Sequence, residues 1–184
     1  MSADPYTLPE DLPVPEDDGA ADHLVGLSMP DLELPSSRGV VNVRDFDVLY
    51  VYPRTGRPGR PMPPGWDDIP GARGCTPQSC AFRDHAAELD EFGATVAGLS
   101  AQTLDDQVEF AERNRMPFPI ISDGGLELAR VLRLPTFDVQ GLTLYKRLAL
   151  IATGATIVTV FYPVFPPDRN AEDVLAWLRA RRQA

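Results

Sequence analysis

Cysteine and histidine are scarce in this chain of 184 residues, which contains two of each. Two cysteines, Cys75 and Cys80, are too few for a disulfide scaffold, and the first residues lack the basic start and apolar run of a signal peptide. A close cysteine pair without a secretory signal indicates redox or metal chemistry, although free cysteines are also often inert and buried. His23 and His85 do not complete a standard four-ligand spacing with them, so zinc is a poor fit and we expect no metal.

Positive charge and long apolar runs are also lacking. The formal net charge is -10, whereas proteins that bind nucleic acid or anionic membranes normally present a basic surface. The longest weakly charged stretch, Leu148 to Val164, is short for a membrane helix and is interrupted by Thr153 and Gly154. We therefore expect a cytoplasmic protein that binds neither nucleic acid nor a membrane.

The chain divides into an N-terminal arm and one folded domain. Residues 1–27 are rich in proline, aspartate and glutamate, and we expect an extended acidic arm without a core of its own. Residues 28–184 suffice for one domain with a hydrophobic core. Within this domain, residues 54–74 form a long loop with several prolines and glycines, and loops of this length tend to be functional. Trp66 is expected to pack this loop against the domain, with the lining of a peroxide or partner surface as the alternative.

Strand and helix patterns alternate along the domain. We expect strands at residues 29–35, 40–43, 48–52, 95–99, 118–121, 144–152 and 155–161, and helices at residues 75–91, 104–115, 125–132 and 171–182. The alternation favours an α/β fold, and the late hairpin makes the sheet mixed. The outline is that of a thioredoxin-like fold, with a mixed central sheet, helices on both faces and an N-terminal extension.

Cys75 lies where the long loop enters a helix. The first turn of a helix has free backbone N–H groups and the positive end of the dipole, and both favour a thiolate over a thiol. Pro77 suits this turn, and Gln78 is expected to be exposed there. Cys80 follows about 140° around and roughly 7.5 Å along an ideal helix, beyond the reach of a relaxed disulfide. The two sulfurs therefore join only if the first turn or two unwinds.

The segment around the cysteines resembles a known family. It is GCTPQSCAFRDH, residues 74–85, and it is similar to the active-site segment of Q-type peroxiredoxins, also called bacterioferritin comigratory proteins. Further segments agree in the same order, and the resemblance covers roughly residues 28–182. These segments are SMPDLELPSSRG, VLYVYPR, VAGLSAQTLDDQVEFAERNRMPFPIISD and YKRLALIATG. The resemblance implies a peroxidase of the AhpC/TSA-redoxin superfamily that needs no cofactor.

The resemblance also implies roles for individual residues. Cys75 corresponds to the peroxidatic cysteine, Cys80 to the resolving cysteine and Arg147 to the active-site arginine. Without the resemblance, Arg147 is more readily explained as the partner of a surface carboxylate. The family motif has a threonine three residues before the peroxidatic cysteine, but this chain has Ala72 there.

The missing threonine leaves the source of the peroxide-orienting hydroxyl open. Pro53 ends the strand before the long loop and matches the proline of the family motif. Thr55 supplies the hydroxyl if the insertion loops out after it, and Thr76 is the other candidate. We expect these three residues and Gly74 to contact the peroxide.

The implied reaction begins with attack of the Cys75 thiolate on hydrogen peroxide or an organic hydroperoxide. The sulfenic acid then condenses with Cys80, and a thioredoxin-type dithiol reduces the disulfide. Such an enzyme is an antioxidant in cell redox homeostasis, and we expect a monomer or weak homodimer. Two alternatives stay open: a redox sensor, and a general protein disulfide oxidoreductase, although the Cys-x-x-Cys motif is absent.

Overall fold

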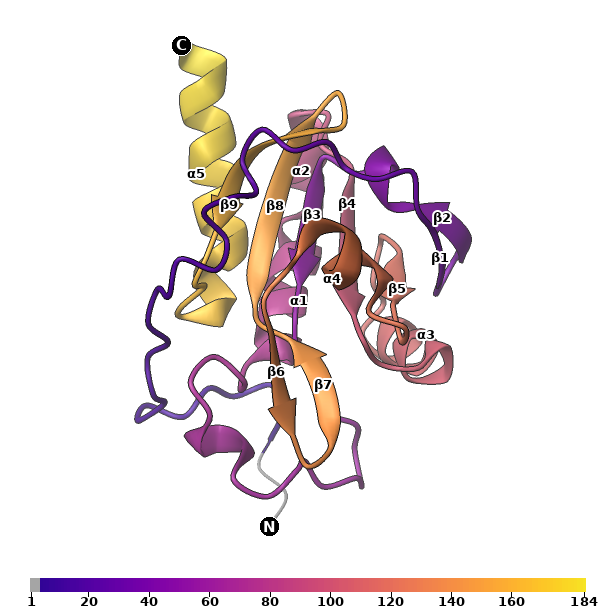
Figure 1. The fold of residues 1–184 in the computed structure, drawn as a ribbon, viewed down its shortest axis with the longest axis vertical. Coiled ribbons are helices and arrows are strands. Elements are labelled where there is room, and N and C mark those ends of the chain that lie inside the picture. Colours follow the sequence, from indigo (N-terminus) through magenta and orange to yellow (C-terminus); the bar gives the residue numbers. More distant parts are fainter. Residues whose placement is uncertain (1–3) are drawn as a thin grey trace.

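A seven-stranded mixed sheet forms the centre of the protein in a computed structural model that describes residues 4–184 (Figure 1). The first three residues of the expected N-terminal arm lie outside the described residues. In hydrogen-bonded order the strands are β2 (Gly39–Asn42), β1 (Glu33–Ser36), β5 (Ile120–Ser122), β4 (Val96–Ser100), β3 (Val48–Val51), β8 (Leu148–Thr153) and β9 (Thr156–Phe161). β3, β4 and β5 are parallel, whereas the other pairings are antiparallel. The structure therefore confirms the mixed sheet that the sequence predicts.

The central strand β3 is buried on both faces, as its unbroken apolar sequence predicts. Leu49 and Val51 pack into a hydrophobic core on one face, and Val48 and Tyr50 pack into a second core on the other face. All four side chains are at most 1% exposed. The long loop leaves from the carboxyl edge of the parallel strands, which is the edge where open α/β sheets bind ligands.

Helices cover both faces of the sheet, which confirms the predicted arrangement. Four of them contribute to the second core: α1 (Cys75–Asp84), α2 (Ala86–Glu91), α3 (Leu104–Arg113) and α5 (Asn170–Gln183). The short helix α4 (Glu127–Leu132) contributes to the first core. Among residues 4–184, no helix has the length and apolar character needed to cross a membrane.

The N-terminal arm completes the face on which α4 lies. Ala21 and Leu24 are buried in the same core as α4. The Asp18 carboxylate accepts hydrogen bonds from Lys146 Nζ and from the Tyr162 hydroxyl, both at 2.7 Å. The arm is therefore tied to the domain, and its apolar side chains belong to the core of that domain.

The helix predicted over residues 75–91 is two helices, because the chain turns at His85. His85 has φ −98° and ψ 9°, and its N–H still bonds to the carbonyl of Ala81 at 3.1 Å. Its ring Nδ1 lies 2.7 Å from the Glu88 carboxylate in the first turn of α2. The change of direction allows α2 to bury Leu89 against the sheet.

A second sheet, which the sequence patterns do not predict, consists of β6 (Thr136–Val139) and β7 (Leu142–Tyr145). The strand expected over residues 144–152 is therefore divided between β7 and β8. Two residues separate these strands, and one of them is Arg147. The division places this arginine at a corner between the two sheets rather than within a strand.

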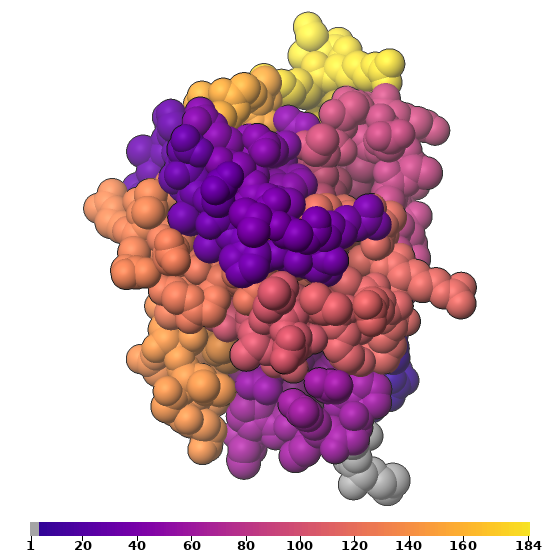
Figure 2. Space-filling view, turned by 90° about the vertical axis from the view of Figure 1, so that its right-hand side faces the viewer, coloured from indigo at the N-terminus to yellow at the C-terminus, as the bar shows by residue number. Residues whose placement is uncertain are grey.

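The long loop packs against the β6–β7 hairpin. It contains one short 3-10 helix, Trp66–Asp68. Trp66 is 3% exposed, its ring centroid lies 6.3 Å from that of Phe137 in β6, and it forms a small apolar cluster with Ala72 and Leu144. The prediction that Trp66 packs the loop against the domain is confirmed. Figure 2 shows the loop, in purple, at the lower end of the molecule.

Candidate active site around Cys75

The start of α1 is fixed by a glycine in close contact with two other segments. Gly74 has φ 105°, and a Cβ added to it would lie 2.3 Å from Cγ of Pro167 and 2.9 Å from Cδ2 of Leu8. Only glycine combines this backbone conformation with such close packing. The following residue, Cys75, begins the helix and is 2% exposed. The loop therefore enters α1 with the cysteine turned into the protein.

The sulfur of Cys75 is surrounded by hydrogen-bonding groups. Nη2 of Arg147 and the main-chain N–H of Arg54 both donate to Sγ, each at 3.3 Å. As a thiol, Cys75 donates in turn to the carbonyl of Ala72 at 3.5 Å. One cationic donor and one main-chain donor are thus available to a negative charge on this sulfur.

Arg147 is itself held by an internal set of acceptors. It is 3% exposed, and its Nη2 donates to the carbonyls of Gly71, Ala72 and Arg73, each at 3.1 Å. Its Nη1 donates to Oε1 of Gln78. No carboxylate within residues 4–184 forms a salt bridge with Arg147, so the alternative of surface ion pairing does not hold. The structure brings Arg147 and Cys75 together, as the resemblance implies.

Gln78 was expected to be exposed, and this expectation is wrong. The side chain is completely buried, and its Nε2 donates to Oδ1 of Asn170, at the start of α5, at 2.9 Å. Gln78 therefore connects α5 to Arg147. Its spacing of three residues from Cys75 places both side chains on one face of α1, and that spacing is the signal that predicts an inward position.

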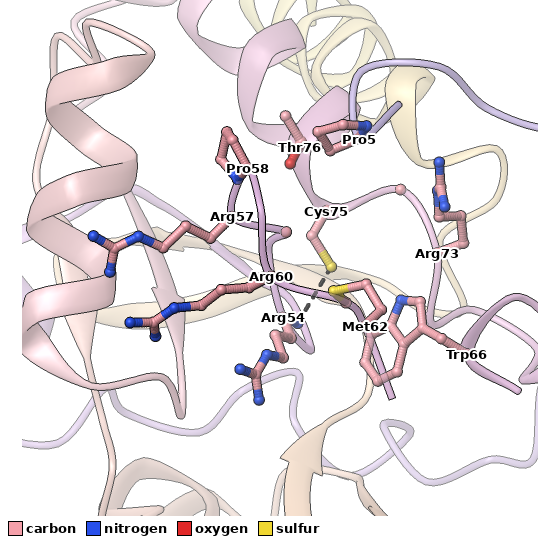
Figure 3. Close-up of a pocket in the computed structure, with 12 residues that line it drawn as sticks. Pro5, Arg54, Arg57, Pro58, Arg60, Met62, Trp66, Arg73, Cys75 and Thr76 are labelled. Atoms are coloured by element: carbon pink, nitrogen blue, oxygen red, sulfur yellow. Dashed lines mark hydrogen bonds between the residues drawn. The ribbon is translucent and has the colours of Figure 1, made fainter. Parts of the chain in front are cut away.

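The two candidate threonines lie in different surroundings. Thr76 is 2% exposed and lines the cavity that contains Cys75 (Figure 3). The Thr55 hydroxyl instead donates to Oε1 of Gln102 at 3.1 Å. Pro53 is buried, and neither Pro53 nor Thr55 is among the residues that line the cavity. Of the expected peroxide contacts, only Gly74 and Thr76 reach this space.

The cavity beside Cys75 has a volume of about 50 Å³. Three segments form its wall: Pro5 of the arm, side chains of the 54–74 loop, and the first turn of α1 (Figure 3). The loop thus brings apolar side chains, among them that of Met62, and several arginines to the space in front of the sulfur. The arrangement admits a small molecule to an otherwise buried cysteine.

Cys80 lies one turn and a half further along α1, in different surroundings. Its sulfur is half-buried, 3.8 Å from Oδ1 of Asn114, which also accepts a hydrogen bond from the Tyr6 hydroxyl at 3.0 Å. Burial raises the pKa of the Cys80 thiol, and the nearby Arg83 opposes this shift. Both cysteines are free thiols with α1 intact. Cys75 and Cys80 thus differ in access and in hydrogen-bonding partners.

These features define a class of protein. The cavity contains a cysteine sulfur at the start of a helix, beside a buried arginine, at the carboxyl edge of a mixed α/β sheet. In the part of the chain that the structure describes, no group of three His, Cys, Asp or Glu side chains is placed to hold a metal ion. The site belongs to a protein that uses thiol chemistry.

Comparisons with known proteins identify the family. The model of the AhpC/TSA family matches residues 69–160, which is half of the chain. A predicted peroxiredoxin of Mycobacterium tuberculosis is 30% identical over 164 residues, which cover 85% of this chain and 97% of the relative. The chain therefore belongs to the AhpC/TSA family and is a peroxiredoxin.

Plant relatives agree with the resemblance to the Q type. The chloroplastic peroxiredoxin Q of Gentiana triflora is 27% identical over 133 residues, 72% of this chain and 54% of the relative. That of Arabidopsis thaliana is 26% identical over 160 residues, 84% of this chain and 67% of the relative. The chain thus spans about half to two thirds of the length of these plant proteins.

Solved structures confirm the thioredoxin-like fold. The crystal structure of peroxidoxin BcpB from Mycobacterium tuberculosis superposes with a TM-score of 0.68 at 27% identity, covering 85% of this chain and 96% of that chain. The bacterioferritin comigratory protein of Xanthomonas campestris has a TM-score of 0.64 at 22% identity, covering 93% and 99%. At this lower identity the second likeness concerns the fold alone.

Proposed function

We propose that this protein is a thiol-dependent peroxidase that reduces hydrogen peroxide or organic hydroperoxides with the sulfur of Cys75. One observation carries the proposal. The buried sulfur receives hydrogen bonds from Arg147 and from the Arg54 main chain, and it lies at a small cavity. Membership of the AhpC/TSA family and the peroxiredoxin relatives support this chemistry.

In the first step the Cys75 thiolate attacks one peroxide oxygen. An S–O bond forms and the O–O bond breaks, so the sulfur is oxidised to a sulfenic acid. The other oxygen leaves with the electron pair of the broken bond, takes up a proton and departs as water or an alcohol. Negative charge spreads from sulfur to the leaving oxygen, where Arg147 and the Arg54 N–H stabilise it.

Thr76 is the residue that we assign to orienting the peroxide. Its hydroxyl-bearing side chain lines the cavity next to Cys75. The Thr55 hydroxyl instead donates a hydrogen bond to Gln102, and Ala72 has no hydroxyl. A donor and acceptor at this place would hold the peroxide in line for attack. Gly74 has no side chain, so it allows the main chain to lie close to the bound peroxide.

Cys80 completes the cycle. After the first turns of α1 open, the Cys80 thiolate attacks the sulfenic sulfur of Cys75, an S–S bond forms, and the sulfenic oxygen takes up a proton and leaves as water. An external dithiol of thioredoxin type then reduces the disulfide and is itself oxidised. The different surroundings of the two sulfurs support this order, because only Cys75 faces the cavity.

A redox sensor and a general disulfide oxidoreductase would use the same cysteines. An enzyme that exchanges disulfides with proteins needs a sulfur that a protein disulfide can reach. Cys75 is 2% exposed and opens to about 50 Å³, which suits a small peroxide. The geometry therefore favours the peroxidase over the oxidoreductase.

Stopped-flow oxidation by hydrogen peroxide tests the proposal in the wild type and two variants. Cys75→Ser is expected to lose all fast reaction, because the attacking sulfur is gone. Cys80→Ser is expected to keep the first step and to fail to turn over with thioredoxin, because no disulfide forms. A Cys75→Ser variant that still reacts fast, or a wild type that reacts no faster than a free thiol, contradicts the proposed function.

A further inference from the structure

The mouth of the Cys75 cavity carries arginines in a protein that is otherwise acidic. Residues 54–74 contain four arginines and two aspartates, a formal charge of +2, whereas the whole chain carries -10. Arg54, Arg57 and Arg60 all line the cavity (Figure 3). A local positive potential at a cavity mouth attracts anions and raises their rate of association.

The positive charge of these side chains is only partly balanced by the protein. Nη1 of Arg57 and Nη1 of Arg60 lie 3.8 and 4.0 Å from the same oxygen of Asp106, too far for hydrogen bonds. Their side chains are 40% and 65% exposed. No residue within 4–184 accepts a hydrogen bond from the side chain of Arg54, Arg57 or Arg60. One carboxylate thus faces two guanidinium groups, those of Arg57 and Arg60, whose N–H donors are free.

Arg73, the fourth arginine of the loop, differs from these three. It donates to the Asp67 carboxylate at 3.2 Å and to the carbonyls of Asp4 and Thr7 at 2.7 and 3.2 Å. These hydrogen bonds attach the N-terminal arm to the loop. The free donors next to Asp106 on α3 are therefore those of Arg57 and Arg60.

The size of the cavity decides where a substrate meets these donors. A volume of about 50 Å³ holds a peroxide group but not a bulky substituent. An organic hydroperoxide would therefore place its O–O group beside Cys75 and its substituent in the mouth. In Figure 3, Arg57 and Arg60 extend side by side away from the Cys75 sulfur, so their guanidinium groups lie outside the narrow space beside it. Pro58 and Met62 are among the apolar residues that line the cavity.

We propose that the loop selects hydroperoxides whose short apolar substituent ends in a carboxylate. Pro58 and Met62 contact the apolar part, and Arg57 and Arg60 bind the carboxylate through their free N–H donors. The inference rests on the proposed peroxidase function, because it concerns the substrate of the same sulfur. The chemistry at Cys75 is unchanged; the arginines determine which peroxides arrive.

A pair of matched probes tests the proposal. They are a tertiary alkyl hydroperoxide whose short side chain ends in a carboxylate, and the methyl ester of the same compound. Second-order rate constants for oxidation of reduced Cys75 are measured by stopped flow in the wild type and in Arg57→Gln/Arg60→Gln. The wild type is expected to react with the acid roughly tenfold faster than with the ester. In the double variant the ratio is expected to fall to about two or less, as it also should in about 0.5 M salt.

A second double variant controls for net charge. Arg181→Gln/Arg182→Gln removes two positive charges from the C-terminal end of α5, far from the loop in Figure 1. It is expected to keep the wild-type ratio, because charges separated by more than about 10 Å of salt solution are screened. An equal fall in both double variants would mean that net charge, not the loop, sets the ratio, and would overturn the proposal.

The remaining outcomes separate this inference from the proposed function. If hydrogen peroxide and the ester react fast but the acid shows no preference, only the carboxylate proposal is wrong. If the double variant slows reduction of the disulfide by a protein dithiol while the acid-to-ester ratio stays unchanged, the arginines serve a protein partner and the proposal is also wrong. If no peroxide reacts with the wild type, the peroxidase function itself fails.

Discussion

A single residue, Gly74, determines how the chain enters α1. Gly74 meets two separate demands, a left-handed φ and a close approach by the ring of Pro167. A proline ring cannot rotate away as a flexible side chain can, so an added Cβ would have to move the main chain. Movement here would shift Cys75, whose sulfur is positioned against Arg147 by the same turn.

Gly74→Ala is therefore expected to lower the free energy of unfolding by about 2–4 kcal/mol and to slow the reaction of Cys75 with hydrogen peroxide at least tenfold. Gly26→Ala is the matched control, because Gly26 has φ 93° and no atom within 4 Å of an added Cβ. The control is expected to cost about 1 kcal/mol and to leave the rate unchanged. Urea unfolding and stopped-flow kinetics measure both. Equal effects in the two variants would show that packing around Gly74 is unimportant.

At the scale of elements, α1 carries both cysteines but gives them different surroundings. Its first turn directs Cys75 to the cavity, and its second directs Cys80 to Asn114 at the end of α3. The helix ends at His85, so the segment that would unwind in the proposed disulfide step is short and bounded by a turn. Burial raises the pKa of the Cys80 thiol, and opening of α1 would remove that burial.

The buried position of Cys80 predicts its titration. In Cys75→Ser, the pH midpoint for alkylation of Cys80 is expected to lie above the ordinary thiol value of about 8.5, because burial destabilises the thiolate. Unfolding the same variant in urea removes the burial, so the midpoint is expected to fall back. Alkylation rates between pH 6 and 11, followed by mass, measure both. A native midpoint at or below the unfolded one would contradict this account of Cys80.

The loop and the β6–β7 hairpin form a second pair of interdependent elements. Trp66 and Ala72 of the loop share an apolar cluster with Leu144 of the hairpin, and the Trp66 ring lies against that of Phe137. The hairpin also leads the chain to Arg147 at its exit. One wall of the cavity and the arginine that contacts the sulfur are therefore held by the same packed cluster.

At the scale of the whole molecule, the N-terminal arm belongs to the domain. The composition of the arm indicates an extended segment without a core of its own, yet its few apolar residues enter the core of the domain beside α4. Leu24 is completely buried, whereas its neighbour Val25 is 57% exposed. The arm thus contributes to the stability of the fold through single side chains rather than through secondary structure.

Leu24→Ala is expected to lower the free energy of unfolding by about 2–5 kcal/mol, because it leaves a cavity in the core. Val25→Ala is the control next to it and is expected to change stability by no more than about 0.5 kcal/mol. Urea unfolding followed by far-UV circular dichroism measures both. If the two variants have the same stability, the arm does not share the core of the domain.

Several features could be predicted because their signals are local. They are the run of apolar residues in β3, the proline in the first turn of α1 and the Cys-x-x-x-x-Cys spacing. Each of these signals determines the structure of residues that lie close to it in the sequence. The β6–β7 hairpin escaped prediction because its turn, Gln140 and Gly141, has φ of 51° and 77° without the usual Asn-Gly signal. The partners that hold Gln78 lie 69 and 92 residues away, so its spacing of three residues from Cys75 was the only local signal for its burial.

The sequence by itself determined that a cysteine begins a helix, that a second cysteine lies on the same helix beyond disulfide reach, and that strands and helices alternate into a mixed sheet. Those properties follow from backbone geometry over short distances. Only the tertiary structure decided which groups surround the sulfur. They are the guanidinium of Arg147, which lies 72 residues further along the chain, and a main-chain N–H of the loop. The cavity beside the sulfur is lined by Thr76 rather than Thr55. Long-range packing sets these neighbours, because a buried arginine takes whatever acceptors the folded core brings to it.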